Sequence, residues 1–388
     1  MQGLTVSPSP HIKSFVTTQK VMSLVLIALL PAVVASGIIF GLQAIIVIAV
    51  SAASAVIWEY VARKIMKRSG TISDLSAAVT GVIFAMNLPV TIPLWMVIIG
   101  TFVAIVIVKQ LFGGLGQNFA NPAIVARIVL LVSFGTQMTN WVKPFYYQNG
   151  VDLTTSATPL VASDKASYMD LFLGNVGGSL GETCALALLI GGLLLVFTKV
   201  ISPATPIAFL GSLALFSFIG GSDPLYEVLA GGAILGAIFM ATDYVTTPIT
   251  NKGKILFGIG CGFITFAIRK WANMPEGVSY SILLMNILTP YLDMLTKTKP
   301  VGGGLKLKAA KKAVEEAKAV FNGVNNELKA LIKSLKKADK KKEKTVEETS
   351  TVVELKAKIE ELKPKLSDAK SVMDEAKKVY KEVKNYER

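Results

Sequence analysis

The sequence predicts an all-α integral membrane protein, with about ten transmembrane helices in two inverted five-helix halves and a cytoplasmic α-helical coiled-coil hairpin. Three observations lead to this prediction. Hydrophobic residues make up 52% of the 388 residues, charged residues only 17%, and the mean hydropathy is +0.55, which excludes an ordinary soluble domain. The apolar runs form two groups on either side of a polar stretch. A charged segment with helical spacing of its apolar residues ends the chain.

The first group begins with residues 21–38 and 42–60, each long enough to cross a hydrocarbon core. A basic cluster follows, made of Arg63, Lys64, Lys67 and Arg68. Because positive charge in short loops favours the cytoplasm, this cluster places the loop and the N-terminus there. Three shorter apolar runs complete five crossings, at 75–86, 95–111 and 124–134.

The polar stretch that follows is therefore predicted to be external, and its aromatic residues Trp141, Tyr146 and Tyr147 suit a membrane interface. Five more apolar runs come after it, at 183–197, 206–219, 226–240, 256–268 and 278–295. The chain then divides into a cytoplasmic segment 1–19, a first membrane half 20–134, an external loop 135–181, a second membrane half 182–299 and a cytoplasmic extension 300–388.

Each half contains a stretch in which Gly or Pro and hydrogen-bonding side chains interrupt the apolar pattern. The first is GGLGQNFANP at 113–122, and the second is ATDYVTTPIT at 241–250. Such interruptions are typical of broken helices that line a site in transporters with inverted repeats. The alternative is that both are ordinary cytoplasmic connections, and the two stretches do not align convincingly with each other.

Glycines cluster before the second group of helices, where Ser179-Leu180-Gly181-Glu182 has the spacing of a capping box. This pattern predicts a helix with Ser179 as its N-cap. Capping explains Glu182, although an ionisable group at the end of a membrane helix is also a candidate for an ion path.

The external loop contains Asp-Leu-Thr-Thr-Ser-Ala-Thr-Pro-Leu at 152–160. The hydroxyl of Thr158 can carry a phosphate ester, and the small residues Ser156 and Ala157 leave room for a transferase. Pro159 restricts the backbone beside them. Taken alone, such a string is more often a Ser/Thr-rich turn whose hydroxyls bond nearby backbone groups.

With residues 73–134 and 174–260, this run resembles the D subunits of Rnf electron-transfer complexes, which are related to subunits of sodium-pumping quinone reductases. In that family a motif Asp-x-x-(Ser/Thr)-(Gly/Ser)-Ala-Thr carries FMN as a phosphoester on its last Thr. Leu153 departs from the pattern, since a small residue is common there. The resemblance implies covalent FMN on Thr158 and an attachment motif that includes Asp152, Thr155, Ser156 and Ala157.

The resemblance further implies a subunit of a complex in the bacterial inner membrane that passes electrons between reduced ferredoxin and NAD while it moves Na⁺ or H⁺. Its implied partners are Rnf subunits of the A, B, C, E and G types and a flavin transferase on the periplasmic side. The chain has no Gly-x-Gly-x-x-Gly after a strand and no Cys cluster, so NAD and iron–sulfur clusters are expected on other subunits.

A second, non-covalent riboflavin lies among the helices of the related quinone-reductase subunit, near its cytoplasmic side. Residue by residue, the resemblance assigns its contacts to Asn118 and Asn121, whose amides can bond the carbonyl and N–H groups of a flavin ring. Asp243 and Thr247 are further candidates, either for the same flavin or for the ion route.

Two alternatives stay open. The first is a channel or transporter of small solutes without a redox role, because broken helices in inverted repeats are also found there. The second is the equivalent subunit of a quinone reductase. A bound chromophore distinguishes the first, and the electron acceptor preferred by the purified complex distinguishes the second.

The last 88 residues carry 23 Lys and Arg against 15 Asp and Glu. Apolar residues recur at spacings of three and four from Ala310 to Leu335 and from Val352 to Val383, which is typical of a coiled-coil seam. The charged stretch 340–351 separates two antiparallel helices, and Pro364 is predicted to kink or split the second. Mixed charge signs argue against nucleic-acid binding. Docking to a partner protein of the complex is our hypothesis for this hairpin, with a dispensable solvated extension as the alternative.

Overall fold

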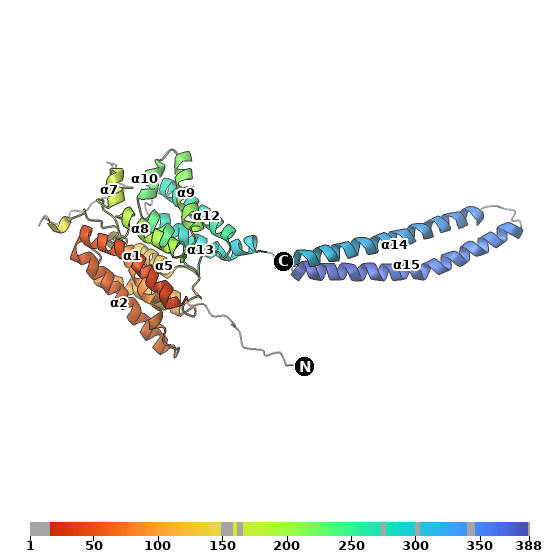
Figure 1. The fold of residues 1–388 in the computed structure, drawn as a ribbon, viewed down its shortest axis with the longest axis horizontal. Coiled ribbons are helices and arrows are strands. Elements are labelled where there is room, and N and C mark those ends of the chain that lie inside the picture. The colour runs from red at the N-terminus through yellow and green to blue at the C-terminus, as the bar shows by residue number, and fades with distance from the viewer. Residues whose placement is uncertain are drawn as a thin grey trace. The chain divides into compact units, whose positions relative to one another are not determined.

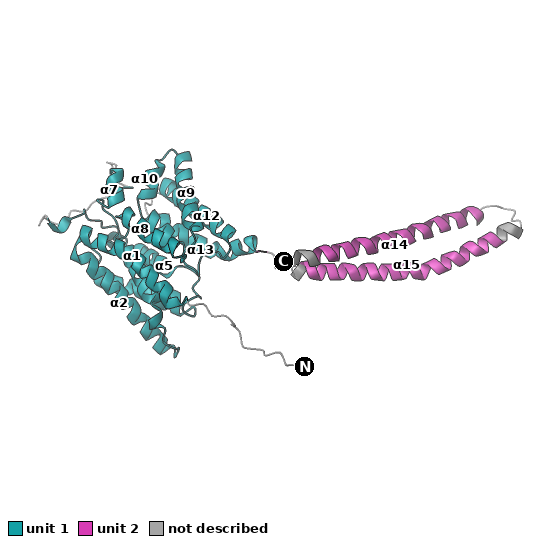
Figure 2. Ribbon diagram, in the orientation of Figure 1, with its two compact units in different colours: residues 1–297 teal, residues 298–388 magenta. Residues whose placement is uncertain are grey.

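The computed structural model describes residues 16–148, 158–160, 166–272, 277–298, 303–339 and 346–386. Helices are the regular elements of this part of the chain (Figure 1). The chain divides into two compact units, residues 1–297 and residues 298–388 (Figure 2).

The first unit begins with two long apolar helices, α1 (Thr18–Phe40) and α2 (Leu42–Ile65). Thr17 caps α1, since its hydroxyl oxygen accepts a hydrogen bond from the backbone N–H of Lys20 at 3.3 Å. Only Gly41 separates the two helices, and its φ of 75° suits a residue without a side chain. Together with α13 (Gly277–Thr296), they are the three helices of the described residues that are long and apolar enough to cross a membrane.

The other helices of the first unit are shorter. Up to residue 138 they are η1 (Ile72–Asp74), α3 (Ser76–Met86), α4 (Leu94–Phe102), η2 (Val103–Gln110), α5 (Pro122–Ser133) and α6 (Gly135–Met138). After residue 138 they are η3 (Tyr146–Gln148), α7 (Tyr168–Leu173), α8 (Ala185–Phe197), α9 (Ala204–Ile219), α10 (Pro224–Leu229), α11 (Ala233–Leu235), η4 (Gly236–Met240) and α12 (Asn251–Trp271).

Two of these segments, η2 and η4, are π-helical. The first continues α4 and the second continues α11. Each ends shortly before one of the polar stretches 113–122 and 241–250. Because π turns widen the helical backbone and are frequent at functional sites, the two stretches begin where regular helical hydrogen bonding is already disturbed.

The predicted apolar run 226–240 is not one helix. α10 ends at Leu229, and Gly231 and Gly232 have φ of 64° and 68° before α11 begins. These left-handed values end a helix and are open to glycine at little cost.

The predicted capping box is also wrong. α8 begins at Ala185 with Cys184 as its N-cap. The backbone N–H groups of Leu180 and Gly181 instead donate to the carbonyls of Leu88 and Met86, at 3.0 and 2.7 Å. These bonds fasten the glycine-rich segment to the end of α3, so it cannot enter a helix.

Close approaches at glycine hold the helices of the first unit together. A Cβ atom on Gly191 of α8 would lie 2.0 Å from the carbonyl oxygen of Ala28 in α1, and one on Gly262 of α12 would lie 2.0 Å from the hydroxyl oxygen of Ser212 in α9. Small residues allow such close helix packing in membranes. α1 packs on α8, α9 on α12, and α5 on α13.

Large apolar side chains face outward on this unit. Leu42, Ile65, Val132 and Phe197 are each between 74% and 81% exposed. Apolar side chains that face outward are required where a protein meets lipid. With the three long apolar helices, this surface indicates a membrane protein.

The second unit consists of α14 (Gly303–Asp339) and α15 (Val346–Tyr386), which pack against each other (Figure 2). Val352 and Met373 of α15 are buried at 7% and 8% exposure. α15 continues through Pro364, so of the two predicted effects of this residue, a kink or a split, the split is wrong. The neighbouring turns and the packing against α14 keep it helical despite the lost backbone hydrogen bond.

Candidate functional site

Thr158 is the one residue of the predicted attachment motif that lies within the described residues. Asp152, Thr155, Ser156 and Ala157 lie outside them. The side chain of Thr158 is 7% exposed. Its hydroxyl oxygen has no hydrogen-bond partner in the described part of the chain. The predicted acceptor is therefore a buried hydroxyl whose hydrogen-bonding capacity is unused there.

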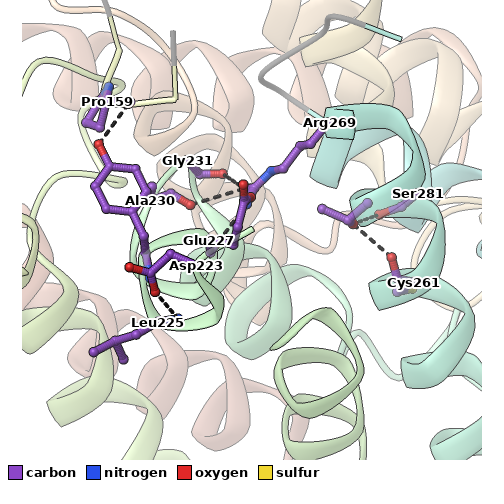
Figure 3. A network of polar contacts seen from close by, with 11 residues as sticks. Pro159, Asp223, Leu225, Glu227, Ala230, Gly231, Cys261, Arg269 and Ser281 are labelled. Carbon is purple, nitrogen blue, oxygen red and sulfur yellow. Dashed lines mark hydrogen bonds and ion pairs between the residues drawn. The ribbon is translucent and has the colours of Figure 1, made fainter. Parts of the chain in front are cut away.

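A hydrogen bond to Pro159 (Figure 3) and an apolar cluster hold this short segment in place. The Tyr226 hydroxyl donates to the carbonyl oxygen of Pro159 at 2.8 Å. A small buried cluster contains Leu171 of α7, Tyr226 of α10 and Ala230, which follows α10. Leu160 packs against this cluster. Segments far apart in sequence thus meet beside Thr158.

Asp223 fixes the start of α10. One of its carboxylate oxygens accepts hydrogen bonds from the backbone N–H groups of Leu225 and Tyr226, at 3.1 and 3.3 Å. The other accepts one from the Tyr168 hydroxyl of α7. This hydrogen bond raises the pKa of Tyr168, because it stabilises the protonated phenol next to a carboxylate. Asp223 therefore joins α7 to α10.

Arg269 of α12 fixes the end of α10 (Figure 3). Its guanidinium donates to the carboxylate of Glu227 at 2.9 Å and to the carbonyl oxygens of Ala230 and Gly231 at 3.1 and 3.0 Å. A guanidinium suits this position because its donors are arranged in a rigid fork.

A small cavity of about 10 Å³ lies beside Thr158. The loop before α8 contributes Gly177, Gly178, Glu182 and Thr183 to the lining of this cavity. Glu182 and Thr183 provide its other polar side chains. Gly231 also lines it. The cavity thus lies between the segment that holds Thr158, the loop before α8 and the end of α10.

Glu182 also belongs to a buried ion pair. Its carboxylate accepts a hydrogen bond from the Arg127 guanidinium of α5 at 3.1 Å, and both side chains are at most 7% exposed. The same guanidinium donates to the Asn87 side-chain oxygen at 2.9 Å and to the Ser279 hydroxyl at 3.1 Å. Arg127 thus joins residues from before α8, after α3 and within α13.

The four residues predicted for a second flavin or an ion route come together in the structure. Asn118, Asn121 and Asp243 line the same cavity. Asn121 donates to the carbonyl oxygen of Met240 at 3.2 Å, and its own oxygen caps α5 by accepting from the N–H of Ala123 at 3.0 Å. The Thr247 hydroxyl donates to the carbonyl oxygen of Asp243 at 2.6 Å. The stretches 113–122 and 241–250 therefore meet, although they are more than 100 residues apart.

Two neighbouring cavities open at this meeting point, of about 100 and 190 Å³. Asn118 and Asn121 line the first, Thr247 lines the second, and Asp243 lines both. Asp243 lies in the non-helical connection before α12, and desolvation raises the pKa of its carboxyl, partly offset by hydrogen bonds such as that with Thr246. The site combines amide donors and acceptors with one carboxyl group.

Comparison with known proteins identifies the family. The profile of the NQR2, RnfD, RnfE family matches residues 5–302. The chain belongs to this family. The predicted family is thus confirmed, and α14 and α15 lie beyond the matched residues.

Relatives with known names make the comparison more specific. The D subunit of the Na⁺-translocating ferredoxin:NAD⁺ oxidoreductase complex of Acetobacterium woodii is 46% identical over 319 residues, which cover 80% of this chain and 99% of the relative. The D subunit of the proton-translocating ferredoxin:NAD⁺ oxidoreductase complex of Clostridium ljungdahlii is 41% identical over 319 residues, which cover 77% of this chain and 96% of the relative. The D subunit of the ion-translocating oxidoreductase complex of Actinobacillus succinogenes is 35% identical over 348 residues, which cover 77% of this chain and 98% of the relative.

Sequence reasoning missed polar residues that this family member buries. Asn286 of α13 places its side-chain amide between the carbonyl oxygen of Thr246 and the N–H of Asn121, at 3.2 and 3.1 Å, so it can donate to the first and accept from the second. Lys109 pairs with Glu59 at 3.1 Å, and both are almost fully buried. An amide or a charge inside a predicted apolar run was the available signal.

Proposed function

We propose that this chain is the D subunit of an ion-translocating ferredoxin:NAD⁺ oxidoreductase complex and that it carries FMN as a phosphoester on Thr158. Family membership and the names of the relatives support the first part. The observation that carries the second is the buried hydroxyl of Thr158, which has no hydrogen-bond partner among the described residues. A buried donor without a partner is costly, and esterification removes this donor while leaving the rest of the side chain in place.

The residues around Thr158 would then hold the attachment point of the flavin in a fixed position. Bound FMN supplies the redox chemistry. Tyr226 holds the backbone next to Thr158, and Arg269 holds the backbone of Gly231, which lines the same cavity. A covalent link suits a redox group on an external face, because it keeps a small molecule from diffusing away.

Covalent attachment is tested by producing the full chain with and without its flavin transferase and scanning a denaturing gel under ultraviolet light. We expect fluorescence that survives denaturation only when the transferase is present, and complete loss of it in Thr158→Ala. Thr198→Ala is the matched control, since this exposed Thr lies at the far end of α8. A dark wild-type band, with the transferase active on another substrate, would rule out the attachment.

A second, non-covalent flavin is proposed where the stretches 113–122 and 241–250 meet. The amides of Asn118 and Asn121 and the adjoining cavities support it, because a flavin ring offers both carbonyl and N–H groups to amide side chains. Asp243 and Thr247 complete the polar lining or belong to the ion route.

We expect Asp243→Asn to reduce either the content of extractable flavin or the ion transport of the assembled complex, because the change removes a carboxylate from this lining without altering its shape. The measurement is flavin extracted per protein together with ion uptake into vesicles. Asp293→Asn is the matched control, because that carboxylate lies near the end of α13 and accepts a hydrogen bond from the exposed backbone of Ile249. If Asp243→Asn leaves both quantities unchanged, Asp243 has neither role.

The proposal includes ten crossings in two inverted five-helix halves, in a bacterial inner membrane, with both termini in the cytoplasm and Thr158 on the periplasmic side. Packing of α1 on α8 and of α5 on α13 supports the two halves, because these are the first and last helices of each five-helix set. The basic cluster after α2 supports the orientation. Other Rnf subunits and a flavin transferase are the proposed partners.

The helical hairpin is proposed as a coiled coil that binds another protein of the complex. Its independence as a compact unit and its position beyond residue 302, where the family match ends, support an added role. We expect a chain ending at residue 302 to keep the thermal stability and the flavin attachment of the first unit and to recover less assembled complex on affinity purification. Undiminished recovery and activity would show that the hairpin is dispensable.

A further inference from the structure

We propose that the cavity beside Thr158 is a cradle for a phosphoryl oxygen, in which Thr183 donates a hydrogen bond to the phosphodiester that joins FMN to Thr158. The inference rests on the proposed attachment of FMN. It assigns a binding role to the loop before α8, which neither the family motif nor helix capping explains.

Two buried hydroxyls without hydrogen-bond partners in the described residues line this cavity. They belong to Thr158 and Thr183, which are 7% and 2% exposed. A buried hydroxyl that has lost water without gaining a partner destabilises the fold. Two such groups at one cavity therefore indicate a polar occupant.

The start of α8 adds further donors. Cys184 is the N-cap of this helix of 13 residues, and no side chain caps it. The first N–H groups of a helix have no partner within the helix and favour an anion. Thr183, which lines the cavity, stands immediately before this N-cap, so α8 begins two residues after the cavity lining.

The size of the cavity selects the occupant. About 10 Å³ accommodates one water-sized group. A phosphoryl oxygen meets this limit, whereas an isoalloxazine ring does not, so the ring lies outside the cradle. The surroundings leave no spare room, because a Cβ atom on Gly232 would lie 2.6 Å from the Glu182 carboxylate.

The charges around the cradle are already balanced. Glu182 lines the cavity, and its carboxylate is paired with Arg127 at 3.1 Å. Arg269, which holds Gly231, is paired with Glu227 at 2.9 Å. Because each carboxylate has its own guanidinium, Glu182 does not expel a phosphodiester, and the hydroxyl and N–H dipoles decide its position.

The test compares thermal unfolding of the full chain, purified in detergent, with and without covalent flavin. We expect flavin to raise the unfolding temperature of the wild type and to have little effect on that of Thr183→Val, which lacks the donor. Ser217→Ala is the matched control, because Ser217 of α9 is also fully buried and its hydroxyl has no partner among the described residues, but it does not line the cavity. Thr183→Ser keeps a hydroxyl and is expected to keep the shift, and Thr183→Ala serves if Thr183→Val does not fold.

The outcomes separate the cradle from the attachment itself. A wild type without covalent fluorescence removes the attachment and the cradle with it. A fluorescent wild type whose unfolding temperature is unchanged by flavin removes the cradle only. The same holds if the variants that lack donors keep the full shift, since an ordered water would then be the occupant of the cavity.

Discussion

Arg127→Met is expected to lower the free energy of unfolding of the first unit by about 3–5 kcal/mol, which is typical of removing one partner of a buried ion pair. Both members of the Arg127–Glu182 pair are nearly inaccessible. Removing the guanidinium leaves the Glu182 carboxylate uncompensated and takes hydrogen bonds from Asn87 and Ser279. The measurement is the unfolding temperature in detergent, followed by the fraction of protein that stays monodisperse on heating.

A paired substitution shows whether the unpaired charge is the cause. Arg127→Met/Glu182→Gln removes both charges and is expected to recover much of the lost stability, because a neutral amide is far less costly to bury than a carboxylate. A double variant as unstable as Arg127→Met would mean that lost packing and hydrogen bonds dominate. An unchanged unfolding temperature in the single variant would contradict the ion pair as a stabilising contact.

Gly191→Val is expected to abolish correct packing of α8 on α1. A Cβ atom at this position would lie 2.0 Å from the carbonyl oxygen of Ala28, and backbone cannot yield as a flexible side chain does. The two helices would have to separate, which exposes the core that they share. We expect little monodisperse protein on size-exclusion chromatography.

Gly211→Val is the control for helix propensity, since both glycines lie inside helices of the first unit and a Cβ on Gly211 has nothing within 4 Å. It introduces the same β-branched side chain and is expected to yield normal protein. Equal yields of the two variants would show that α1 and α8 do not approach as closely as described.

Most helices could be predicted from hydropathy alone, because an apolar run of sufficient length has few alternatives to a helix in a membrane. Periodicity could not place the break at Gly231 and Gly232, since glycine is tolerated inside membrane helices and only the folded contacts require left-handed φ there. The Ser179 capping box failed for a similar reason. Its backbone bonds to residues more than 90 positions away in sequence, and local patterns carry no such information.

For the candidate sites, local sequence identified the centre and tertiary structure supplied the surroundings. Thr158 and the two polar stretches could be selected from motif and composition. The common cavity of Asn118, Asn121 and Asp243 depends on helix packing. Asn286 and the Arg127–Glu182 pair were missed because a single polar residue in an apolar run has no visible partner until the fold brings one to it.

The hydrogen bond from Tyr226 to Pro159 has a consequence for how far a flavin on Thr158 could travel. The bond anchors the chain one residue from the attachment point, and Glu227 next to Tyr226 is held in turn by Arg269 of α12. The distance that the flavin ring could travel is then set by its own ribityl phosphate and not by the length of the loop that contains Thr158. A short tether confines the ring to a small volume and raises its effective concentration at a nearby electron carrier. Electron transfer from such a ring would be governed by distance within the complex, with little dependence on loop diffusion.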